Sequence, residues 1–459
     1  MISSLIDDLR AIVGAEHVLT DDRARDKYAS DGTRHYHRPD LIVLPDGADQ
    51  VSAVVGICAR DRLPIVPRGA GTGYSGGAVP IQGGVVLSLE RMHRILEIDQ
   101  ANLLAIVEPN VVTGDLQDAV ERVGLFYPPD PASLRQSVIG GNVAESAGGP
   151  RAFKYGTTKQ YVLGLQAVLP TGEIITTGGK VVKNVAGYDL TQLLVGSEGT
   201  LAIITRITLR LIPLPAARLT LRATFAAVAD AAHAVDRIVA ERVVPAALEL
   251  IDADSLDAIA RHLGGRPLAP GGTAALVLIE VDGTPEAAAE DAVRVERACR
   301  ASGATEVLRA RTAAERDDLW RVRRELSPAL RTLAPVKFNN DIVVPKGRIP
   351  ELFDLIARLR ADQGVRIACF GHAGDGNIHV NVMVGESEDE LRRARDTVRV
   401  LFEGVLALEG SISGEHGIGL SKAPYLSMQL GADEIALMQR VKRAFDPHGI
   451  LNPGKIFRN

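Results

Sequence analysis

The chain has 459 residues, of which 46% are hydrophobic and 24% are charged, and its formal net charge is −5. This length predicts two or three domains of an ordinary soluble globular protein, and the negative charge with only 4% aromatic residues gives no indication of nucleic-acid binding. Cys58, Cys299 and Cys369 form no CxxC pair, which excludes a sequence-local iron–sulfur, c-type haem or zinc-ribbon signature and favours the reducing cytoplasm.

The chain begins with a helical pattern. Leu5, Leu9, Ile12 and Val13 recur at helical spacing and predict a short amphipathic helix. This start is acidic, unlike a signal peptide, and no apolar run of membrane-spanning length follows. From about residue 39 to 215, short β-branched runs such as "GVVLSLE" and "LAIITRITLRLIPLP" alternate with glycine-rich turns. This texture predicts a region of short strands and short helices.

The first glycine-rich stretch is "PRGAGTGYSGG", Pro67 to Gly77. It matches GxGxxG formally, but Pro80 and two further glycines lead into another strand rather than a helix. A Rossmann loop must open a helix, so this context excludes that fold. The remaining interpretations are a backbone nest that binds a pyrophosphate and a mobile surface turn, and this stretch alone favours neither.

Two more glycine clusters follow: "PPDPASLRQSVIGGNVAESAGG" with "KYG" behind it, and "GSEGTLAIIT". Such glycine density lets the backbone approach a flat ligand closely. The three clusters in this order resemble the FAD-binding domain of the vanillyl-alcohol-oxidase-type (PCMH) flavoproteins, and the terminal "FDPHGILNPGK" is similar to the segment that closes on their flavin. The resemblance runs from about residue 37 to the end. It is strongest to the group of the glycolate oxidase D-subunit, D-lactate dehydrogenase and D-2-hydroxyglutarate dehydrogenase.

The resemblance implies bound FAD. Some relatives attach FAD through a histidine in the first loop, but Thr72 stands there, and Pro67–Gly77 contains neither His nor Cys. Non-covalent FAD is therefore implied. The positions implied to contact FAD are Pro67, Arg68, Gly69, Ala70, Gly71, Thr72, Gly73, Ser75, Pro131, Ser133, Gly140, Gly141, Asn142, Ala144, Ser146, Gly149, Tyr155, Gly156, Glu198, Gly199, Ile203 and Asn452.

Beyond residue 216 the pattern changes to longer strands that alternate with longer helices. "RLTLRATF", "TAALVLIEVDG" and "NNDIVVP" each precede a helical pattern, and "ADEIALMQRVKRAF" ends the chain as a helix. We expect a second α+β domain, ferredoxin-like in type, with two loosely similar halves. The predicted divisions are an N-terminal helical segment (1–36), a PCMH-type FAD-binding domain (37–216), a substrate or cap domain (217–420) and a C-terminal segment that returns to the flavin (421–459).

"FGHAGDGNIHVNVM", residues 370–383, predicts a hairpin. Asp375-Gly376 is a favoured two-residue turn, and in that register His372 lies directly opposite His379. Alternation along the strand then places Asn381 on the same face. Facing histidines can share a divalent metal, but two histidines alone are more often a hydrogen-bonded pair within a sheet.

"SISGEHGIG" changes this balance, because Glu415 and His416 lie between glycines that let the backbone turn tightly. Two histidines and one carboxylate form a reasonable metal site with open positions; Zn²⁺ is expected first, with Mn²⁺ and Fe²⁺ as alternatives. The family resemblance then implies that His372, His379 and Glu415 bind the metal and that His416 is the general base.

Residues that bind the substrate are also implied by the resemblance. "WRVRRELSPAL" looks like the helix that binds the substrate carboxylate; its Arg323 and Ser327 are four residues apart and share a helical face. A solvated basic face is an equally good interpretation of that stretch. Lys337 and Asn381 are the other implied substrate contacts.

Together these features predict an FAD- and metal-dependent dehydrogenase of a small D-2-hydroxy acid, glycolate or D-lactate. D-2-Hydroxyglutarate is the alternative substrate, and its second carboxylate would need Lys337 or Arg324. A flavin-binding electron-transfer subunit with a vestigial substrate site is the alternative function. The chain has no cysteine cluster, so electrons would leave to a quinone, a soluble carrier or an iron–sulfur subunit. A homodimer or a dehydrogenase of several subunits, cytoplasmic and peripheral to the membrane through its acceptor, would fit.

Overall fold

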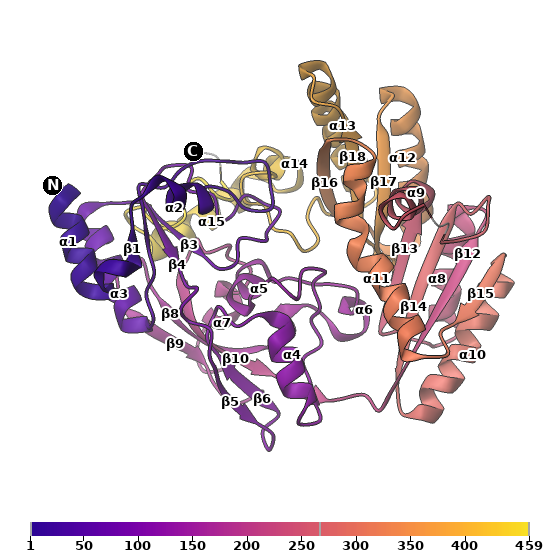
Figure 1. The fold of residues 1–459 in the computed structure, drawn as a ribbon, viewed down its shortest axis with the longest axis horizontal. Helices are drawn as coiled ribbons and strands as arrows, with labels where there is room; N and C mark the ends of the chain where they lie inside the picture. Colours follow the sequence, from indigo (N-terminus) through magenta and orange to yellow (C-terminus); the bar gives the residue numbers. More distant parts are fainter. Residues whose placement is uncertain (1, 266–267, 458–459) are drawn as a thin grey trace. The chain divides into compact units, whose positions relative to one another are not determined.

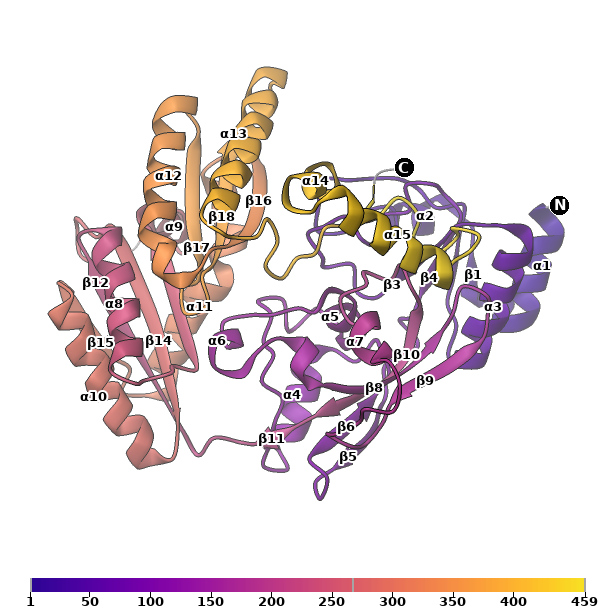
Figure 2. The same ribbon diagram turned by 180° about the vertical axis from the view of Figure 1, so that it is seen from behind.

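The computed structural model describes residues 2–265 and 268–457, and the chain forms two compact units (Figures 1 and 2). Unit 1 comprises Met1–Gly148, Thr157–Leu214 and Glu415–Asn459. Unit 2 comprises Gly149–Gly156 and Pro215–Gly414. Both units combine helices with sheets, which confirms the predicted α+β class. No helix in the described part of the chain is both long and apolar enough to cross a membrane.

The described residues of unit 1 form three sheets. The first has the order β1-β2-β4-β3 and is parallel from β2 to β3; the second is antiparallel in the order β5-β6-β10-β8-β9; the third pairs β11 with β7. The strands are β1 (Val18–Leu19), β2 (Leu41–Val43), β3 (Ile65–Arg68), β4 (Val85–Ser88), β5 (Ile95–Asp99), β6 (Leu104–Val107), β7 (Leu125–Phe126), β8 (Val162–Val168), β9 (Ile174–Gly178), β10 (Ile203–Arg210) and β11 (Ile212–Pro213). The helices are α1 (Ile2–Val13), α2 (Asp22–Lys27), α3 (Ala48–Asp61), α4 (Thr113–Glu121), α5 (Ile139–Glu145), α7 (Leu190–Leu194), α14 (Leu426–Gln429) and α15 (Ala432–Phe445).

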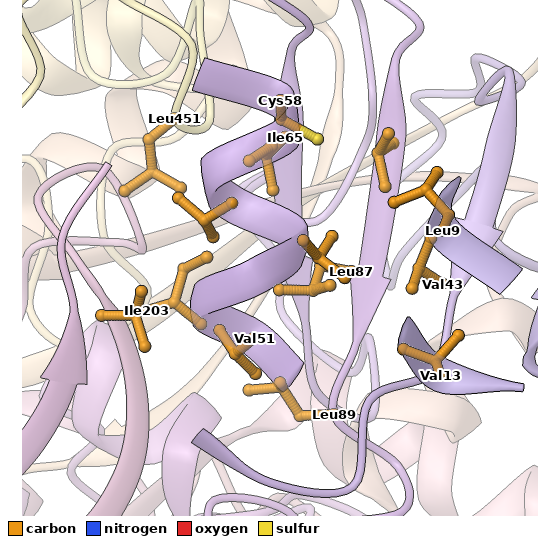
Figure 3. Close-up of a cluster of buried hydrophobic side chains, with 14 of the residues drawn as sticks. Leu9, Val13, Val43, Val51, Cys58, Ile65, Leu87, Leu89, Ile203 and Leu451 are labelled. Atoms are coloured by element: carbon orange, nitrogen blue, oxygen red, sulfur yellow. The ribbon is translucent and has the colours of Figure 1, made fainter. Parts of the chain in front are cut away.

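Helix α3 organises the core of unit 1 (Figure 3). Its buried residues Val51, Val54, Val55 and Cys58 recur at helical spacing and pack against the first two sheets. Leu9 and Val13 of α1 close one side of this cluster, as the amphipathic pattern predicts. The cluster includes Ile65 of β3, which leads into the first glycine-rich stretch, and Ile203 of β10, which lies at the end of the third.

The C-terminal segment belongs to unit 1, where it adds to the first sheet. Leu451 forms a parallel bridge with Ile65, and the Asn452 N–H donates to the Ile65 carbonyl at 2.7 Å. The Asn452 amide also donates to the carbonyls of Gly77 and Glu198, at 3.0 and 2.8 Å. The end of the chain therefore joins the first and third glycine clusters, in agreement with the predicted return of this segment.

Unit 2 is built on one antiparallel sheet of seven strands in the order β15-β12-β14-β13-β17-β18-β16. The strands are β12 (Ala217–Phe225), β13 (Ala247–Asp252), β14 (Ala275–Gly283), β15 (Glu306–Arg309), β16 (Val336–Val343), β17 (Arg366–His372) and β18 (Asn377–Val384). The helices are α6 (Ala152–Tyr155), α8 (Val228–Ala240), α9 (Ala253–His262), α10 (Pro285–Ala301), α11 (Ala313–Ala329), α12 (Ile349–Gln363) and α13 (Glu388–Ala407). Helices α8, α10, α12 and α13 cover one face, and α9 and α11 pack on the other (Figures 1 and 2).

The sheet of unit 2 consists of two similar halves that meet at β13 and β17. In the first half, α8 follows the first strand, β12, and α10 follows the third strand, β14. Within the sheet, β14 lies between β12 and β13, and β15 lies on the other side of β12. The second half repeats this order with β16, β17 and β18, and its fourth strand is reduced to the bridge between Val343 and Ser411. This is the ferredoxin-like β-α-β-β-α-β order, so the prediction of two loosely similar halves is confirmed.

Residues 149–156 join unit 2 through two side chains that converge on Asp282 of β14. The Lys154 ammonium and the Tyr155 hydroxyl, at 2.5 and 2.7 Å, donate to its two carboxylate oxygens. The Asp282 side chain is 1% exposed. A buried carboxylate is costly without such donors.

Lys154→Met should therefore lower the free energy of unfolding by about 1–3 kcal/mol, because Asp282 stays buried with one donor fewer. Urea unfolding measures this loss, and Lys159→Met, at an exposed position, is the control. Equal unfolding midpoints for the two variants would show that the pair contributes nothing to the attachment of this segment.

Candidate active site

The three glycine clusters come together in unit 1. The N–H groups of Gly196 and Glu198 in the third cluster donate to the carbonyls of Val143 and Ala144 in the second, at 2.9 and 2.8 Å. A Cβ on Gly69 of the first cluster would lie 2.6 Å from Val138 in the second. A Cβ on Gly73, by contrast, would meet open space. The clusters thus form one glycine-rich surface whose backbone a flat ligand with a pyrophosphate can approach.

The predicted FAD contacts divide between the two units. Gly149, Tyr155 and Gly156 lie in unit 2, and all the others lie in unit 1. Several of the side chains in unit 1 are already bound within the protein: Arg68 donates to the Ser30 carbonyl, Asn142 donates to Thr113 at 2.6 Å, and Ile203 is part of the α3 core. At such positions the backbone, rather than the side chain, is the group that a cofactor can reach.

Glu198 of the third cluster holds the loop that follows His416. Its carboxylate accepts the N–H groups of Ile418 and Gly419 at 2.8 and 2.6 Å. Burial raises its pKa, while these N–H groups oppose the rise. Glu145 of the second cluster is half-buried nearby with one buried carboxylate oxygen, and desolvation together with the Glu198 charge raises its pKa well above the usual range. Two carboxylates therefore lie beneath the loop that carries His416.

The loop with Glu415 and His416 lies against the first and second glycine clusters. A Cβ on Gly148 would lie 2.6 Å from a Glu415 carboxylate oxygen, and the His416 ring lies 5.4 Å from the Tyr74 ring between centroids. The Ser75 carbonyl accepts the Leu420 N–H at 2.7 Å. The predicted base is thus positioned beside the predicted pyrophosphate loop.

In unit 2, the predicted register of the histidine hairpin is wrong. His372 pairs with Asn377, and Phe370 pairs with His379, so four residues rather than two form the turn. The shift is two residues, and side chains alternate with a period of two, so the histidines keep a common face. Their rings lie 5.4 Å apart between centroids and stand nearly perpendicular.

Polar side chains cover this face of the sheet. Strand β16 places Lys337, Asn339 and Asp341 opposite Met383, Asn381 and His379 of β18, respectively. The Asn339 amide donates to Asn381 at 2.9 Å. Two further predicted substrate contacts meet here: Lys337 donates to the Ser327 hydroxyl of α11 at 2.7 Å, and burial lowers the pKa of Lys337 to about 8.

Asp341 links this face to the end of unit 2. Its carboxylate is fully buried, lies 3.9 Å from Nδ1 of His379, and accepts the Asn377 amide at 2.6 Å. It also accepts the Gly414 N–H at 2.9 Å. Because Glu415 is the next residue, one peptide unit of about 3.8 Å separates its Cα from that of Gly414.

Arg323 and His372 share a partner, Glu249 of β13. Nδ1 of His372 lies 2.5 Å from one carboxylate oxygen, and Nε of Arg323 donates to the other. Burial alone would raise the pKa of Glu249, but the charges and hydrogen bonds of Arg323 and His372 lower it to about 2. The predicted carboxylate-binding arginine is therefore buried in the site rather than part of a solvated face.

Sequence reasoning missed Glu249 and Asp341. Each is an acidic residue inside a strand of otherwise mostly apolar or amide side chains, "ALELID" and "VKFNNDIV". A charge inside a buried strand has to be paired, which was the available signal. Neither residue belongs to a local motif, so only that burial pattern marks it.

The donor set on this face fits a divalent metal. An ionised Glu249 carboxylate can only accept, so Nδ1 of His372 carries a proton, and a ring that carries no second proton presents its lone pair at Nε2. His379 supplies a second imidazole on the same face. Imidazole and carboxylate are the ligands of zinc, manganese and iron sites in proteins.

Comparisons with known proteins identify two family models along the chain. Residues 39–178 match the model "FAD binding domain", and residues 214–456 match the model "FAD linked oxidases, C-terminal domain". The chain is 42% identical to glycolate oxidase subunit GlcD of Bacillus subtilis over 98% of this chain and 96% of that protein. It is 38% identical to a D-lactate dehydrogenase of Anaerostipes hadrus over 97% of this chain and 94% of that protein. It is 35% identical to a D-2-hydroxyglutarate dehydrogenase of Stutzerimonas stutzeri over 99% of this chain and 99% of that protein.

Solved structures show the same fold. p-Cresol methylhydroxylase with substrate bound superimposes with a TM-score of 0.82 at 19% identity, over 100% of this chain and 97% of that one. 4-Ethylphenol oxidase from Gulosibacter chungangensis gives 0.80 at 20% identity, over 100% and 98%. The expected PCMH-type fold is therefore confirmed.

Proposed function

Because the chain belongs to the family of FAD-linked oxidases, we propose that it oxidises a small D-2-hydroxy acid, glycolate or D-lactate, to the 2-oxo acid with FAD and a divalent metal. The observation that carries this proposal is the single polar face of unit 2, where Arg323, Lys337, His372, His379 and Asn381 gather. Two of the relatives, named above, are a glycolate oxidase subunit and a D-lactate dehydrogenase.

Each residue has a proposed part in binding. His372, His379 and Glu415 hold the metal, and the glycine clusters hold FAD through their backbone. Bound FAD supplies a hydride acceptor, and a bound metal supplies a Lewis acid that lowers the pKa of the substrate hydroxyl. Arg323 binds the substrate carboxylate. Asn381 and Lys337 orient the rest of the substrate, and Lys337 is held by its hydrogen bond to Ser327.

His416 is the proposed general base. It takes the proton of the C2 hydroxyl as the C2 hydride departs, so that the carbonyl of the 2-oxo acid forms neutral rather than protonated. Glu198 keeps the loop of His416 in place through the N–H groups of Ile418 and Gly419. The two protein contributions are thus a fixed carboxylate clamp and a fixed base.

An anaerobic titration tests this function. Glycolate, D-lactate and D-2-hydroxyglutarate, with L-lactate and L-2-hydroxyglutarate as controls, are added to the purified yellow protein, and flavin absorbance is followed. We expect glycolate or D-lactate to bleach the flavin and the L-acids to leave it oxidised. A flavin that none of the D-acids or glycolate bleaches would contradict the proposal and favour an electron-transfer subunit. Bleaching by D-2-hydroxyglutarate alone would assign the alternative substrate.

FAD is proposed to be non-covalent, since the first loop has Thr72 and no His or Cys from Pro67 to Gly77. Acid precipitation should release all of the flavin into the supernatant. A flavin that stays with the denatured protein and fluoresces on a denaturing gel would show covalent attachment.

The electrons must leave the flavin through another molecule. The three cysteines are buried and free, and burial raises the pKa of the Cys58 and Cys299 thiols to about 12. Thiols of this kind are poor redox partners. We propose that a quinone, a soluble carrier or a separate iron–sulfur subunit accepts the electrons; GlcD relatives are named as subunits, which favours an enzyme of several subunits.

A further inference from the structure

Glu249 is a buried acidic residue that belongs to none of the sequence motifs that predict the active site. It lies in β13, whose six residues are all buried, and its own side chain is 0% exposed. The sheet register places it directly opposite His372 of β17. A charge in such a position needs partners for both carboxylate oxygens.

Each oxygen of Glu249 has a different partner from the proposed site. Oε1 lies 2.5 Å from Nδ1 of His372, and Oε2 accepts Nε–H of Arg323. An ionised carboxylate cannot donate, so this arrangement keeps the His372 proton on Nδ1 and leaves the Nε2 lone pair for a ligand bond. The same carboxylate fixes the orientation of the arginine.

Arg323 keeps a donor for a further group. Its guanidinium lies over the Phe370 ring at 4.9 Å and the residue is 3% exposed. Nη2 is buried and, within the described residues, has no hydrogen-bond partner. A buried guanidinium N–H without a partner is costly, and a carboxylate is the group that it binds best.

We propose that Glu249 is a positioning residue that couples metal binding to substrate binding: one carboxylate selects the metal-binding tautomer of His372 and aims Arg323 at the substrate carboxylate. This inference rests on the proposed function for the identity of the two ligands. It goes beyond that function in predicting that a single side chain, in contact with neither ligand, sets the affinity for both.

Glu249→Gln tests the coupling. The amide can accept from only one side and must donate on the other, so it either reverses the His372 tautomer or turns Arg323 away. We expect metal affinity, measured by competition with a chromophoric chelator, to fall about 10–100-fold. We also expect KM for the hydroxy acid to rise about 10-fold or more, while FAD content is unchanged.

Two further variants make the result specific. Glu280→Gln is the matched control, because Glu280 is also buried in this sheet but binds Trp320 and Thr220 instead; its metal affinity and KM should equal those of the wild type. Glu249→Asp keeps a carboxylate at this position and should retain metal affinity better than Glu249→Gln. If Glu249→Gln does not fold, Glu249→Asp takes its place in the test. Metal affinity and KM within two-fold of wild type in folded Glu249→Gln would overturn the proposal.

The failure of this inference can be distinguished from failure of the proposed function. A wild-type flavin that no hydroxy acid bleaches contradicts the function, yet the effect of Glu249→Gln on metal affinity can still be measured. A bleached wild-type flavin with unchanged metal affinity in the variant contradicts only the role of Glu249.

Discussion

His416→Ala is expected to lower kcat by about 10²–10⁴-fold, because the variant has no group to take the hydroxyl proton in the transition state. FAD should remain bound, since the predicted FAD contacts lie in other segments. His416 lies next to the Tyr74 ring and precedes the N–H groups that Glu198 accepts, so the loop keeps its anchors when the imidazole is removed. Steady-state kinetics with glycolate or D-lactate, together with the flavin content of the variant, measure the effect.

His233→Ala is a suitable control for this experiment. His233 is exposed on α8, and its replacement should leave kcat at the wild-type value. A His416→Ala variant that turns over within a few-fold of wild type would remove His416 as the base. Loss of FAD from that variant would instead mean that the loop supports cofactor binding.

Removal of the metal is the second large effect that we expect. Dialysis against a chelator should lower kcat by at least about ten-fold, because a Lewis acid stabilises the charge that develops in the transition state by several kcal/mol. The protein should stay yellow, because the metal and FAD have separate proposed ligands. Zn²⁺, Mn²⁺ or Fe²⁺ added back singly should restore activity, and the ion that restores it most fully identifies the metal. Metal analysis of the same samples gives the stoichiometry.

The variants His372→Ala and His379→Ala each lack one proposed metal ligand, so they test the metal site by mutation. Both should contain less metal than the wild type and should not regain full activity with added metal. A chelated, metal-free protein with unchanged kcat would show that the two histidines have a structural role within the sheet, as a hydrogen-bonded pair would.

The hairpin illustrates how far the sequence determines the site. The alternation of "NIHVNVMV" specifies which side chains share a face, and the structure agrees that His372, His379 and Asn381 do. The register depends on the turn, and Asp375-Gly376 alone favours a two-residue turn. In the structure the Gly376 carbonyl accepts the Val344 N–H from the end of the neighbouring strand, and Gly376 adopts φ 83°. A partner distant in sequence therefore sets the turn, which local preference cannot reveal.

Tertiary pairing also explains what was missed. The glycine clusters, the Glu415-His416 loop and the helix with Arg323 have local signatures that predict their chemistry. Glu249 has no such signature, because its role comes from a sheet register that joins β13 to β17, 123 residues apart along the chain at the His372 contact. Asn339 meets Asn381 through the pairing of β16 with β18. Sequence patterns predicted the elements, whereas long-range pairing determined which side chains meet.

In the proposed reaction, a D-2-hydroxy acid loses its C2 hydrogen as hydride to the flavin. Rapid mixing of the oxidised protein with glycolate or D-lactate under anaerobic conditions, with ordinary and C2-deuterated substrate, measures that step alone. We predict a single phase of flavin reduction that deuterium slows and that His416→Ala nearly abolishes. Flavin that stays oxidised with every D-2-hydroxy acid tested, or reduction at the same rate with both isotopes, would contradict this reaction.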